Sequence, residues 1–294
     1  MPEARPTGSV GEALGKATER LQQAGVLNPK REATALWAAV AGSTPGDVWL
    51  TRAGAADAAA FDRFWTAVGR RAGGAPFPYA VERAAFRHLD LLVDARALIP
   101  RPETEGLVGL VLEWAGNRAA SPRGLAADVG TGTGCIALAL AAEGDFAGVV
   151  ATERSPQAAA LARENVARVA PRVPVDVREG DLLSPLAGAR YRVIVSNPPY
   201  LTEGEYDALE PSVRAFEPRE ALVSGADGLD ATRALLAGAA PLLERGGLLA
   251  FEIDERRGAL VRSLAHESGW RRIGIHDDLF GRPRFALAFP GEDV

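Results

Sequence analysis

The feature that most constrains the fold of this chain is the alternation of short apolar runs with longer amphipathic runs after residue 124. Short runs bounded by turn residues predict strands, and apolar residues at helical spacing predict helices. Strands are expected at residues 125–129, 149–152, 173–177, 191–196 and 248–253, with closing strands near 271–275 and 284–289. Helices are expected at residues 135–142, 156–169, 231–243 and 259–267. This alternation predicts an α/β domain, in which helices cover both faces of a mostly parallel sheet.

The first 75 residues have a different pattern. Residues 10–26, 29–42 and 55–72 carry apolar residues at helical spacing and are separated by glycine-rich stretches, which predicts a small helical bundle. Its expected core is aromatic and consists of Trp37, Trp49, Phe61, Phe64 and Trp65.

The segment after the bundle lacks helical periodicity and predicts a linking hairpin, with short strands within residues 81–92 and 91–98. The expected organisation is a helical bundle at residues 1–75, a linking hairpin at 76–99 and the α/β domain at 100–294.

Composition excludes several classes of protein. The chain has one cysteine, Cys135, and three histidines without zinc-type spacing, so neither an internal disulfide nor a metal site is expected. No apolar run approaches the roughly 18–20 residues that span a bilayer. Residues 1–10 lack the basic start and apolar stretch of a secretory signal, which favours a cytoplasmic protein. The net charge of −5 and the lack of a basic block argue against direct nucleic-acid binding.

A glycine-rich turn follows the first strand of the α/β domain. It reads Asp128-Val129-Gly130-Thr131-Gly132-Thr133-Gly134, and a helix is expected to begin directly after it. Glycines let a backbone turn sharply and approach a ligand closely, and a helix N-terminus offers free N–H groups. The same context serves dinucleotides, but here the third glycine comes one position too early for the G-x-G-x-x-G pattern.

Two acidic residues strengthen the interpretation of this turn as a nucleotide site. Glu153 ends the second strand, 19 residues after Gly134, where a carboxylate can accept protons from both ribose hydroxyls. Asp181 follows the third strand, where a carboxylate can meet an adenine amino group. Because sheets of this kind bind ligands at the carboxyl ends of their strands, the turn, Glu153 and Asp181 predict one nucleotide pocket.

The sequence Asn197-Pro198-Pro199-Tyr200 stands at the carboxyl end of the strand expected at 191–196. The two prolines fix an extended turn and remove two backbone donors. The remaining groups are acceptors, namely the Asn197 side-chain oxygen and the Pro198 carbonyl, which together can bind both hydrogens of an NH2 group. Tyr200 offers a flat ring on which a planar amide or a base can stack.

This arrangement suits the methylation of a planar nitrogen. An amide nitrogen is a poor nucleophile, because its lone pair is delocalised into the carbonyl. Two acceptors that hold its hydrogens and orient it toward the methyl group of a sulfonium supply position and electrostatic help together. The sequence therefore predicts a methyltransferase that uses S-adenosyl-L-methionine, with Asn197, Pro198 and Tyr200 as catalytic residues and Pro199 beside them in the substrate site.

Over almost its whole length the chain resembles the release-factor glutamine methyltransferase family, which methylates the Gly-Gly-Gln glutamine of peptide-chain release factors. The Gly-rich turn and Asn-Pro-Pro-Tyr are shared with many amino methyltransferases, so other segments give the resemblance its specificity. The most specific of them are the proline-rich segment Leu98-Ile99-Pro100-Arg101-Pro102-Glu103-Thr104-Glu105, the stretch Phe216-Glu217-Pro218 and the Gly281-Arg282 ending of Asp278-Leu279-Phe280-Gly281-Arg282. The match also includes Arg31-Glu32-Ala33, Ala221-Leu222, Gly246-Gly247 and Glu252-Ile253.

The resemblance implies a Rossmann-like class I methyltransferase sheet with a reversed last strand, and a five-helix N-terminal domain that helps to dock the release factor. It implies that Gly130, Thr131, Gly132, Thr133 and Gly134 pass the methionine and ribose parts of the cofactor. Glu153 is then expected to take the ribose hydroxyls, Asp181 and Leu182 to flank the adenine, and Asn197 to border the cofactor as well as the substrate. The segment 101–105 is expected to close over the cofactor.

Three residues depart from the pattern of the family. Asp254 stands where glycine is usual, Pro283 where an acid is usual, and Leu182 where an aromatic residue is frequent. They bear on the sheet edge and on the adenine pocket.

Three alternatives remain open at this point. One is a sister glutamine methyltransferase acting on a ribosomal protein. Another is an adenine or guanine amino methyltransferase, against which the acidic balance and the lack of a base-reading insert count. The third is a non-catalytic cofactor-binding protein, which would not need Asn197.

Overall fold

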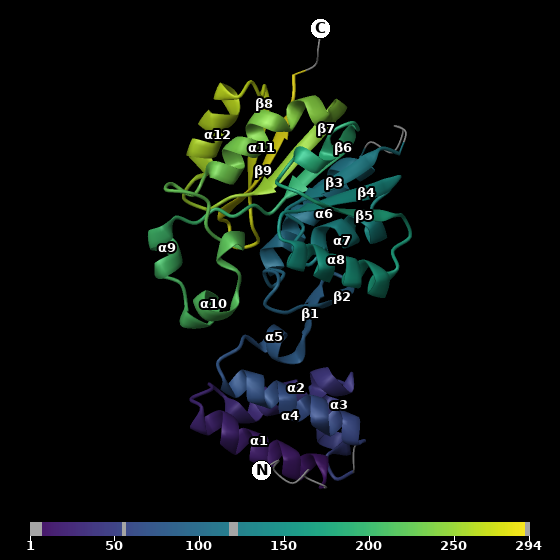
Figure 1. Ribbon diagram of the computed structural model, residues 1–294, viewed down its shortest axis with the longest axis vertical. Helices are drawn as coiled ribbons and strands as arrows, with labels where there is room; N and C mark the ends of the chain where they lie inside the picture. Colours follow the sequence, from purple (N-terminus) through teal and green to yellow (C-terminus); the bar gives the residue numbers. More distant parts are fainter. Residues whose placement is uncertain (1–7, 55–56, 118–122, 292–294) are drawn as a thin grey trace. The chain divides into compact units, whose positions relative to one another are not determined.

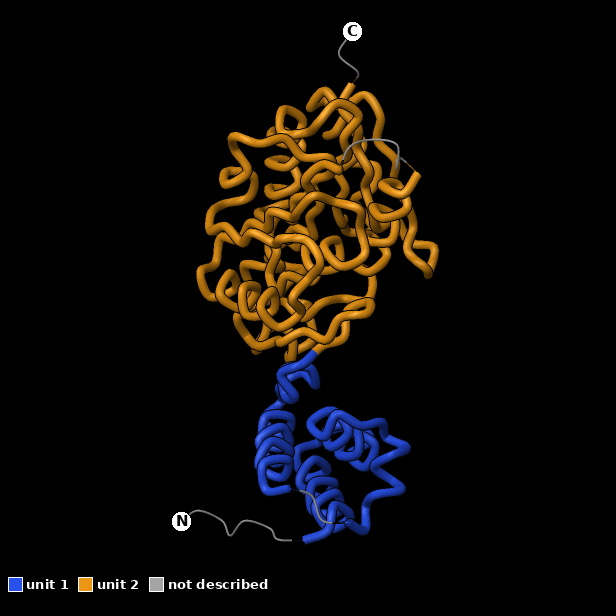
Figure 2. Tube along the Cα trace, turned by 90° about the vertical axis from the view of Figure 1, so that its right-hand side faces the viewer, with its two compact units in different colours: residues 1–83 blue, residues 84–294 orange. Residues whose placement is uncertain are grey.

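The computed structural model describes residues 8–54, 57–117 and 123–291. The chain divides into two compact units, residues 1–83 and 84–294, coloured separately in Figure 2. Residues 1–7 at the start of the chain and residues 55–56 of the expected third helix lie outside the described residues.

Helices make up the first unit. They are α1 (Val10–Gln23), α2 (Pro29–Ala41), α3 (Pro45–Thr51), α4 (Ala58–Ala72) and α5 (Phe77–Val81). The three helices predicted from periodicity are confirmed as α1, α2 and α4. Periodicity did not predict the short helices α3 and α5, although the resemblance implied five helices, and the absence of helix predicted for residues 76–81 is wrong. Each spans two turns or less, which is too short for a periodic pattern to show.

The core of the first unit lies between α1, α2 and α4. Trp37 packs against Phe61 and Phe64 with ring centroids 5.2 and 5.0 Å apart, and all three side chains are buried. The prediction that Trp49 belongs to this core is wrong. Its side chain is 62% exposed, and the guanidinium of Arg52 lies over its ring.

The second unit begins with a hairpin and continues as a seven-stranded sheet. The hairpin strands are β1 (Arg83–Phe86) and β2 (Leu89–Leu92), so the strand predicted within residues 91–98 is wrong and the hairpin is shorter than expected. The sheet strands are β3 (Leu125–Val129), β4 (Gly148–Glu153), β5 (Val175–Glu179), β6 (Tyr191–Ser196), β7 (Leu243–Glu252), β8 (Arg272–Asp277) and β9 (Pro283–Phe289).

The strand order is β5-β4-β3-β6-β7-β9-β8. The neighbours from β5 to β7 pair in parallel, and β9 pairs antiparallel with both β7 and β8. The expected reversed last strand is thereby confirmed. The strand predicted at 173–177 lies two residues later, as β5.

Successive residues of the strands face opposite sides of the sheet and join two separate cores. On β6, for example, Val193 and Val195 belong to one core and Ile194 to the other. Helices α6 (Pro102–Gly116) and α7 (Cys135–Glu143) cover the first face, and α8 (Pro156–Val169) packs along β5 and the hairpin. Helices α11 (Asp230–Gly238) and α12 (Gly258–Glu267) cover the second face, as Figure 1 shows.

A buried asparagine fastens the hairpin to the sheet domain. Asn165 of α8 is fully buried, and its side-chain oxygen accepts a hydrogen bond from the Leu92 nitrogen at 2.7 Å. Its side-chain nitrogen donates to the carbonyls of Leu92 at 3.0 Å and Thr133 at 2.9 Å. One side chain therefore links the end of β2 to the glycine turn.

Candidate active site

A pocket of about 720 Å³ opens at the carboxyl ends of β3, β4 and β6, which is where sheets of this kind bind their ligands. Its volume lies in the usual range for small-molecule and cofactor sites. Of the residues predicted for the site, it is lined by Gly130, Thr131, Gly132, Thr133, Glu153, Asp181, Leu182, Asn197 and Pro199. Gly134, Pro198 and Tyr200 are not among the lining residues.

The glycine turn crosses the pocket floor between β3 and α7. Gly130, Gly132 and Gly134 have φ values of +71°, +55° and +85°, a region that side chains with a Cβ rarely adopt. A Cβ on Gly130 would meet no other atom within 4 Å, and on Gly132 only the Ala97 side chain at 3.8 Å. Backbone conformation, rather than crowding within the protein, therefore requires glycine at these two positions, and their open side is free for a ligand.

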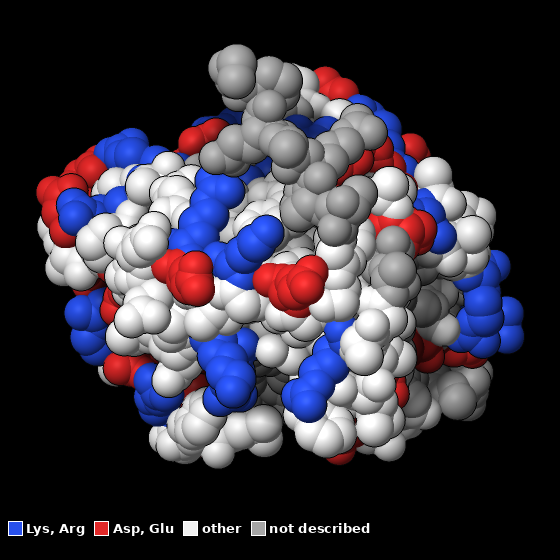
Figure 3. Space-filling view, turned by 90° about the horizontal axis from the view of Figure 1, so that it is seen from below, with Lys and Arg blue, Asp and Glu red and all other residues white. Residues whose placement is uncertain are grey.

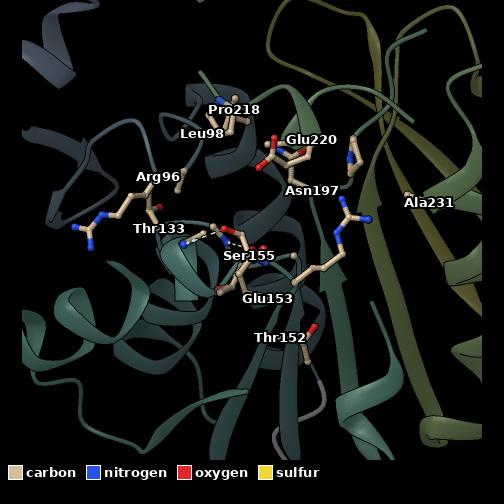
Figure 4. Close-up of a pocket in the computed structure, with 18 of the residues that line it drawn as sticks. Arg96, Leu98, Thr133, Thr152, Glu153, Ser155, Asn197, Pro218, Glu220 and Ala231 are labelled. Carbon is tan, nitrogen blue, oxygen red and sulfur yellow. Dashed lines mark hydrogen bonds between the residues drawn. The ribbon is translucent and has the colours of Figure 1, made fainter. Parts of the chain in front are cut away.

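Glu153 ends β4 and braces this turn. Its Oε2 accepts a hydrogen bond from the Gly132 nitrogen at 2.9 Å, and its Oε1 accepts one from the Ser155 nitrogen at 2.9 Å. Figure 4 shows Glu153 and Ser155 together at the pocket wall. Since each carboxylate oxygen can accept more than one hydrogen bond, both remain able to receive a ligand hydroxyl.

Asp128 lies beneath the turn, and its role was not foreseen from the sequence. It is fully buried, and its carboxylate accepts hydrogen bonds from the Thr131 hydroxyl at 2.5 Å and the Ala137 nitrogen at 3.0 Å. Burial raises the pKa of Asp128 to about 7, although these two hydrogen bonds oppose the rise. The available signal was an acidic residue inside an otherwise apolar strand.

Asp181 and Leu182 line the pocket beyond the end of β5. Leu182 has a φ of +45°, and its carbonyl accepts a hydrogen bond from the Thr152 hydroxyl at 2.8 Å. Leu182, which stands where the family often has an aromatic residue, is therefore part of the pocket wall. Its backbone is in a strained conformation, and the hydrogen bond from β4 holds it there.

Asn197 follows β6 directly and begins a segment that is anchored on both sides. The Asn197 side-chain nitrogen donates a hydrogen bond to the Thr104 hydroxyl at 3.1 Å. The backbone nitrogens of Tyr200 and Leu201 donate to the Leu222 carbonyl at 3.2 and 2.9 Å. Burial, and next the charge of Glu252, raise the pKa of Tyr200 to about 12, so its hydroxyl stays protonated at neutral pH.

A second segment closes the pocket above Asn197. Glu217 is buried, and its carboxylate accepts hydrogen bonds from the Ile99 nitrogen at 3.2 Å and from Arg101 at 2.6 Å. Ile99, Arg101 and Pro218 line the pocket, so the ion pair between the partly exposed Arg101 and the buried Glu217 joins two parts of its wall. Figure 4 shows Glu220, Asn197, Pro218 and Leu98 among the side chains that line the pocket. Glu217 stands in the family-specific segment Phe216-Glu217-Pro218, but nothing in the sequence indicated its ion pair, and Glu220 carried no signal.

The other two departures from the family pattern lie outside the pocket lining. Asp254 follows β7 and forms ion pairs with Arg256 at 2.7 Å and Arg257 at 3.2 Å. Burial alone would raise its pKa, but the hydrogen bonds and charge of Arg256 bring it below the usual value. Arg257 also pairs with Glu205 at 2.8 Å, so Asp254 helps to fix the segment that follows Tyr200. Pro283 begins β9, next to the turn at residues 278–282.

Comparisons with known proteins agree with this geometry. Residues 12–81 match the family described as PrmC N-terminal domain, and residues 115–215 match the family described as Methyltransferase small domain. The N-terminal domain of human METTL16 in complex with SAH, at 17% identity, has a similar fold with a TM-score of 0.54. The match covers 87% of this chain and 94% of that one. Fold and pocket together define a methyltransferase with a Rossmann-like sheet.

Curated relatives narrow the class to one family. The release factor glutamine methyltransferase of Moorella thermoacetica is 40% identical over 96% of this chain and 99% of its own length. That of Deinococcus radiodurans is 42% identical over 94% of this chain and 97% of its own length. The chain belongs to the release factor glutamine methyltransferase family, and the resemblance inferred from its motifs is confirmed.

Proposed function

We propose that this chain transfers a methyl group from S-adenosyl-L-methionine to the side-chain amide nitrogen of the Gly-Gly-Gln glutamine of peptide-chain release factors. The observation that carries the proposal is the position of Asn197, which lies at the end of β6 and lines the same pocket as the glycine turn and Glu153. A group that binds an NH2 and a site for a nucleoside are thus contiguous. The names of the curated relatives support the choice of a release-factor glutamine.

The residues of the pocket fit the cofactor. The open face of the glycine turn leaves room for the methionine and ribose parts, and the Glu153 oxygens retain lone pairs for the ribose hydroxyls. Asp181 and Leu182 stand where the adenine is expected. When bound, this cofactor supplies an electrophilic methyl group.

The chain itself supplies position. In the proposal, the Asn197 Oδ1 and the Pro198 carbonyl accept the two amide hydrogens of the glutamine, and the Tyr200 ring supports its plane. This holds the nitrogen in line for attack and stabilises the positive charge that develops on it. In the proposal, the proton of the methylated nitrogen leaves to water and no side chain acts as a base. Tyr200, whose hydroxyl stays protonated at neutral pH, is not needed to accept it.

The direct test is mass spectrometry of a release factor incubated with the protein and cofactor, in search of one added methyl on the Gly-Gly-Gln glutamine. Asn197→Ala should abolish the labelling while the protein still binds S-adenosylhomocysteine. Asn117→Ala, at an exposed asparagine after α6, serves as the matched control and should label normally. Labelling that persists in Asn197→Ala would refute the role of Asn197.

Two rival substrates are outcomes of the same assay. Exclusive labelling of a ribosomal protein would assign the chain to the sister reaction, and labelling of a nucleic acid would assign it to the nucleobase class. The net charge of −5 counts against the latter. The part of the surface visible in Figure 3 also shows acidic side chains among the basic ones rather than a field of one sign.

Partner and location follow from the proposed reaction. A release factor would be the protein partner, and the cytoplasm, where translation ends, would be the place of the reaction. Across the described residues, none of the helices combines the length and the apolar character that a bilayer span requires.

A further inference from the structure

The orientation of the Asn197 amide decides whether the proposed site can work. An asparagine side chain has nearly the same shape when its oxygen and nitrogen are exchanged. With Oδ1 toward the substrate it accepts a hydrogen from an NH2 group. With Nδ2 toward the substrate, the Asn197 NH2 group faces the substrate NH2 group, and because both are donors they repel each other. Some feature of the protein must therefore distinguish the two orientations.

Thr104, in the first turn of α6, is the neighbour that contacts this amide. The Asn197 Nδ2 donates to the Thr104 Oγ1 at 3.1 Å, and the Thr104 side chain is buried. A threonine hydroxyl can also donate one hydrogen bond of its own, and it could equally well donate to an asparagine oxygen. Thr104 alone would therefore tolerate both orientations of Asn197.

Glu252, at the end of β7, removes this ambiguity. Its carboxyl group is buried, and a hydrogen bond with the Thr104 side chain acts to lower its pKa. Above about pH 7, where this carboxyl group is mostly ionised, it can only accept hydrogen bonds, so the Thr104 proton points to Glu252. The Thr104 oxygen is then left as an acceptor, and only the NH2 end of Asn197 can meet it.

We propose that Thr104 and Glu252 are positioning residues that hold the Asn197 amide with its oxygen toward the substrate nitrogen. The proposal rests on the proposed function for the identity of that nitrogen. It assigns a purpose to a carboxylate buried behind the site, whose Oε1 has no hydrogen-bond partner among the described residues. A buried group of this kind is costly, and a purely structural role would not require it.

The packing of α6 keeps Thr104 in register with Asn197. Gly106, two residues further along α6, lies so close to the Phe285 ring of β9 that a Cβ there would come within 2.9 Å of it. Phe285 pairs with Glu252 across the sheet. The helix that carries Thr104 is thus seated directly over the strand pair that carries Glu252.

The charge state of Glu252 adds a second readout. Burial raises the pKa of Glu252 to about 7; Arg284 and Arg101 favour the ionised form, and Glu103 opposes it. Below pH 7 the protonated carboxyl can donate to Thr104, whose own proton is then free to turn toward Asn197. Activity should therefore fall as the pH drops through about 7.

The test compares three variants in methyl transfer to the release factor. Thr104→Val keeps the shape but removes the hydroxyl, and kcat should fall by about 10- to 100-fold, as for a misplaced catalytic group. The affinity for S-adenosylhomocysteine should stay within about twofold. Thr104→Ser keeps the hydroxyl and should restore most of kcat. Glu252→Gln should lower kcat and flatten its pH dependence near 7, because its amide can both donate and accept.

A readout that needs no substrate separates this proposal from the proposed function. The side-chain NH2 signals of Asn197 in ¹⁵N NMR, assigned by their loss in Asn197→Asp, should shift in Thr104→Val and remain nearly unchanged in Thr104→Ser. If the native protein fails to methylate the release factor, the proposed function is wrong, whatever these signals show. If Thr104→Val and Glu252→Gln keep native kcat and pH profile, or if the Asn197 signals do not move, the positioning role is wrong.

Discussion

The Glu153 carboxylate accepts a hydrogen bond from the backbone nitrogen of Gly132 at 2.9 Å, across 21 residues of sequence. The end of β4 is thereby tied to the middle of the glycine turn. The residue predicted to bind the ribose is thus also the residue that holds the turn in place, so its two effects on a ligand must be separated by experiment.

We expect Glu153→Gln to weaken the binding of S-adenosylhomocysteine by about 10- to 100-fold, which corresponds to the loss of charge-assisted hydrogen bonds. An amide oxygen can still accept from one backbone nitrogen, but the NH2 end cannot accept from the other. Titration calorimetry gives the affinity. The matched control is Glu179→Gln at the end of β5, where an exposed carboxylate pairs with Arg163, and it should leave the affinity unchanged.

Asn165→Leu should destabilise the protein by about 3–5 kcal/mol, because it leaves the buried Thr133 carbonyl and two partly buried backbone groups of Leu92 without their partner. Urea unfolding measures the effect. Asn117→Ala, at an exposed asparagine, should change the free energy of unfolding by less than about 0.5 kcal/mol. A small effect of Asn165→Leu would mean that water replaces the lost hydrogen bonds and that the hairpin is held by other contacts.

Glu217→Gln should raise KM for the release factor and lower the unfolding midpoint. The substitution removes the charge that pairs with Arg101 and leaves one of the two hydrogen bonds of this buried side chain without an acceptor. Steady-state kinetics and thermal unfolding are the measurements. Asp176→Asn breaks an ion pair between exposed side chains and should alter neither quantity. Unchanged kinetics in Glu217→Gln would show that this part of the pocket wall does not depend on the ion pair.

Asp128→Asn should gain stability relative to the native protein as the pH rises from 5 to 7. Burial raises the pKa of Asp128 from 3.8 to about 7 in the folded state, so the folded protein holds this proton more tightly than the unfolded chain does. That stabilising contribution is lost between the two pKa values, by about 1.4 kcal/mol per pH unit. Asparagine does not titrate, so urea unfolding of both proteins at pH 5 and pH 7 should diverge by about 2 kcal/mol. Parallel pH dependence of the two proteins would contradict the raised pKa.

Most of the sheet domain could be predicted because its signals are local. Each strand is a short apolar run next to a turn, and Gly130, Gly132 and Gly134 are required by backbone conformation alone. The reversed strand β9 and the family followed from motifs rather than from periodicity. The short helices α3 and α5 were missed by periodicity because they contain too few residues for a pattern, and only the resemblance implied them.

The supporting residues of the site could not be predicted, because their partners are distant in sequence. Thr104 and Asn197 are 93 residues apart, and Arg101 and Glu217 are 116 apart. A threonine in a first helical turn or a glutamate among charged residues carries no mark of such a contact. Only the tertiary structure shows that Thr104 and Glu217 are buried, and burial strengthens the hydrogen bonds that they form.

The contact of Thr104 with Asn197 and Glu252 also has an evolutionary consequence. A substitution at one of the three positions changes which hydrogen bonds the other two can make, so their mutational effects should not add. A hydrophobic residue at 104 would leave the buried carboxylate of Glu252 without its hydrogen-bond donor, which costs stability. A simultaneous hydrophobic substitution at 252 would remove that cost. These positions are therefore expected to change together among related chains, or not at all.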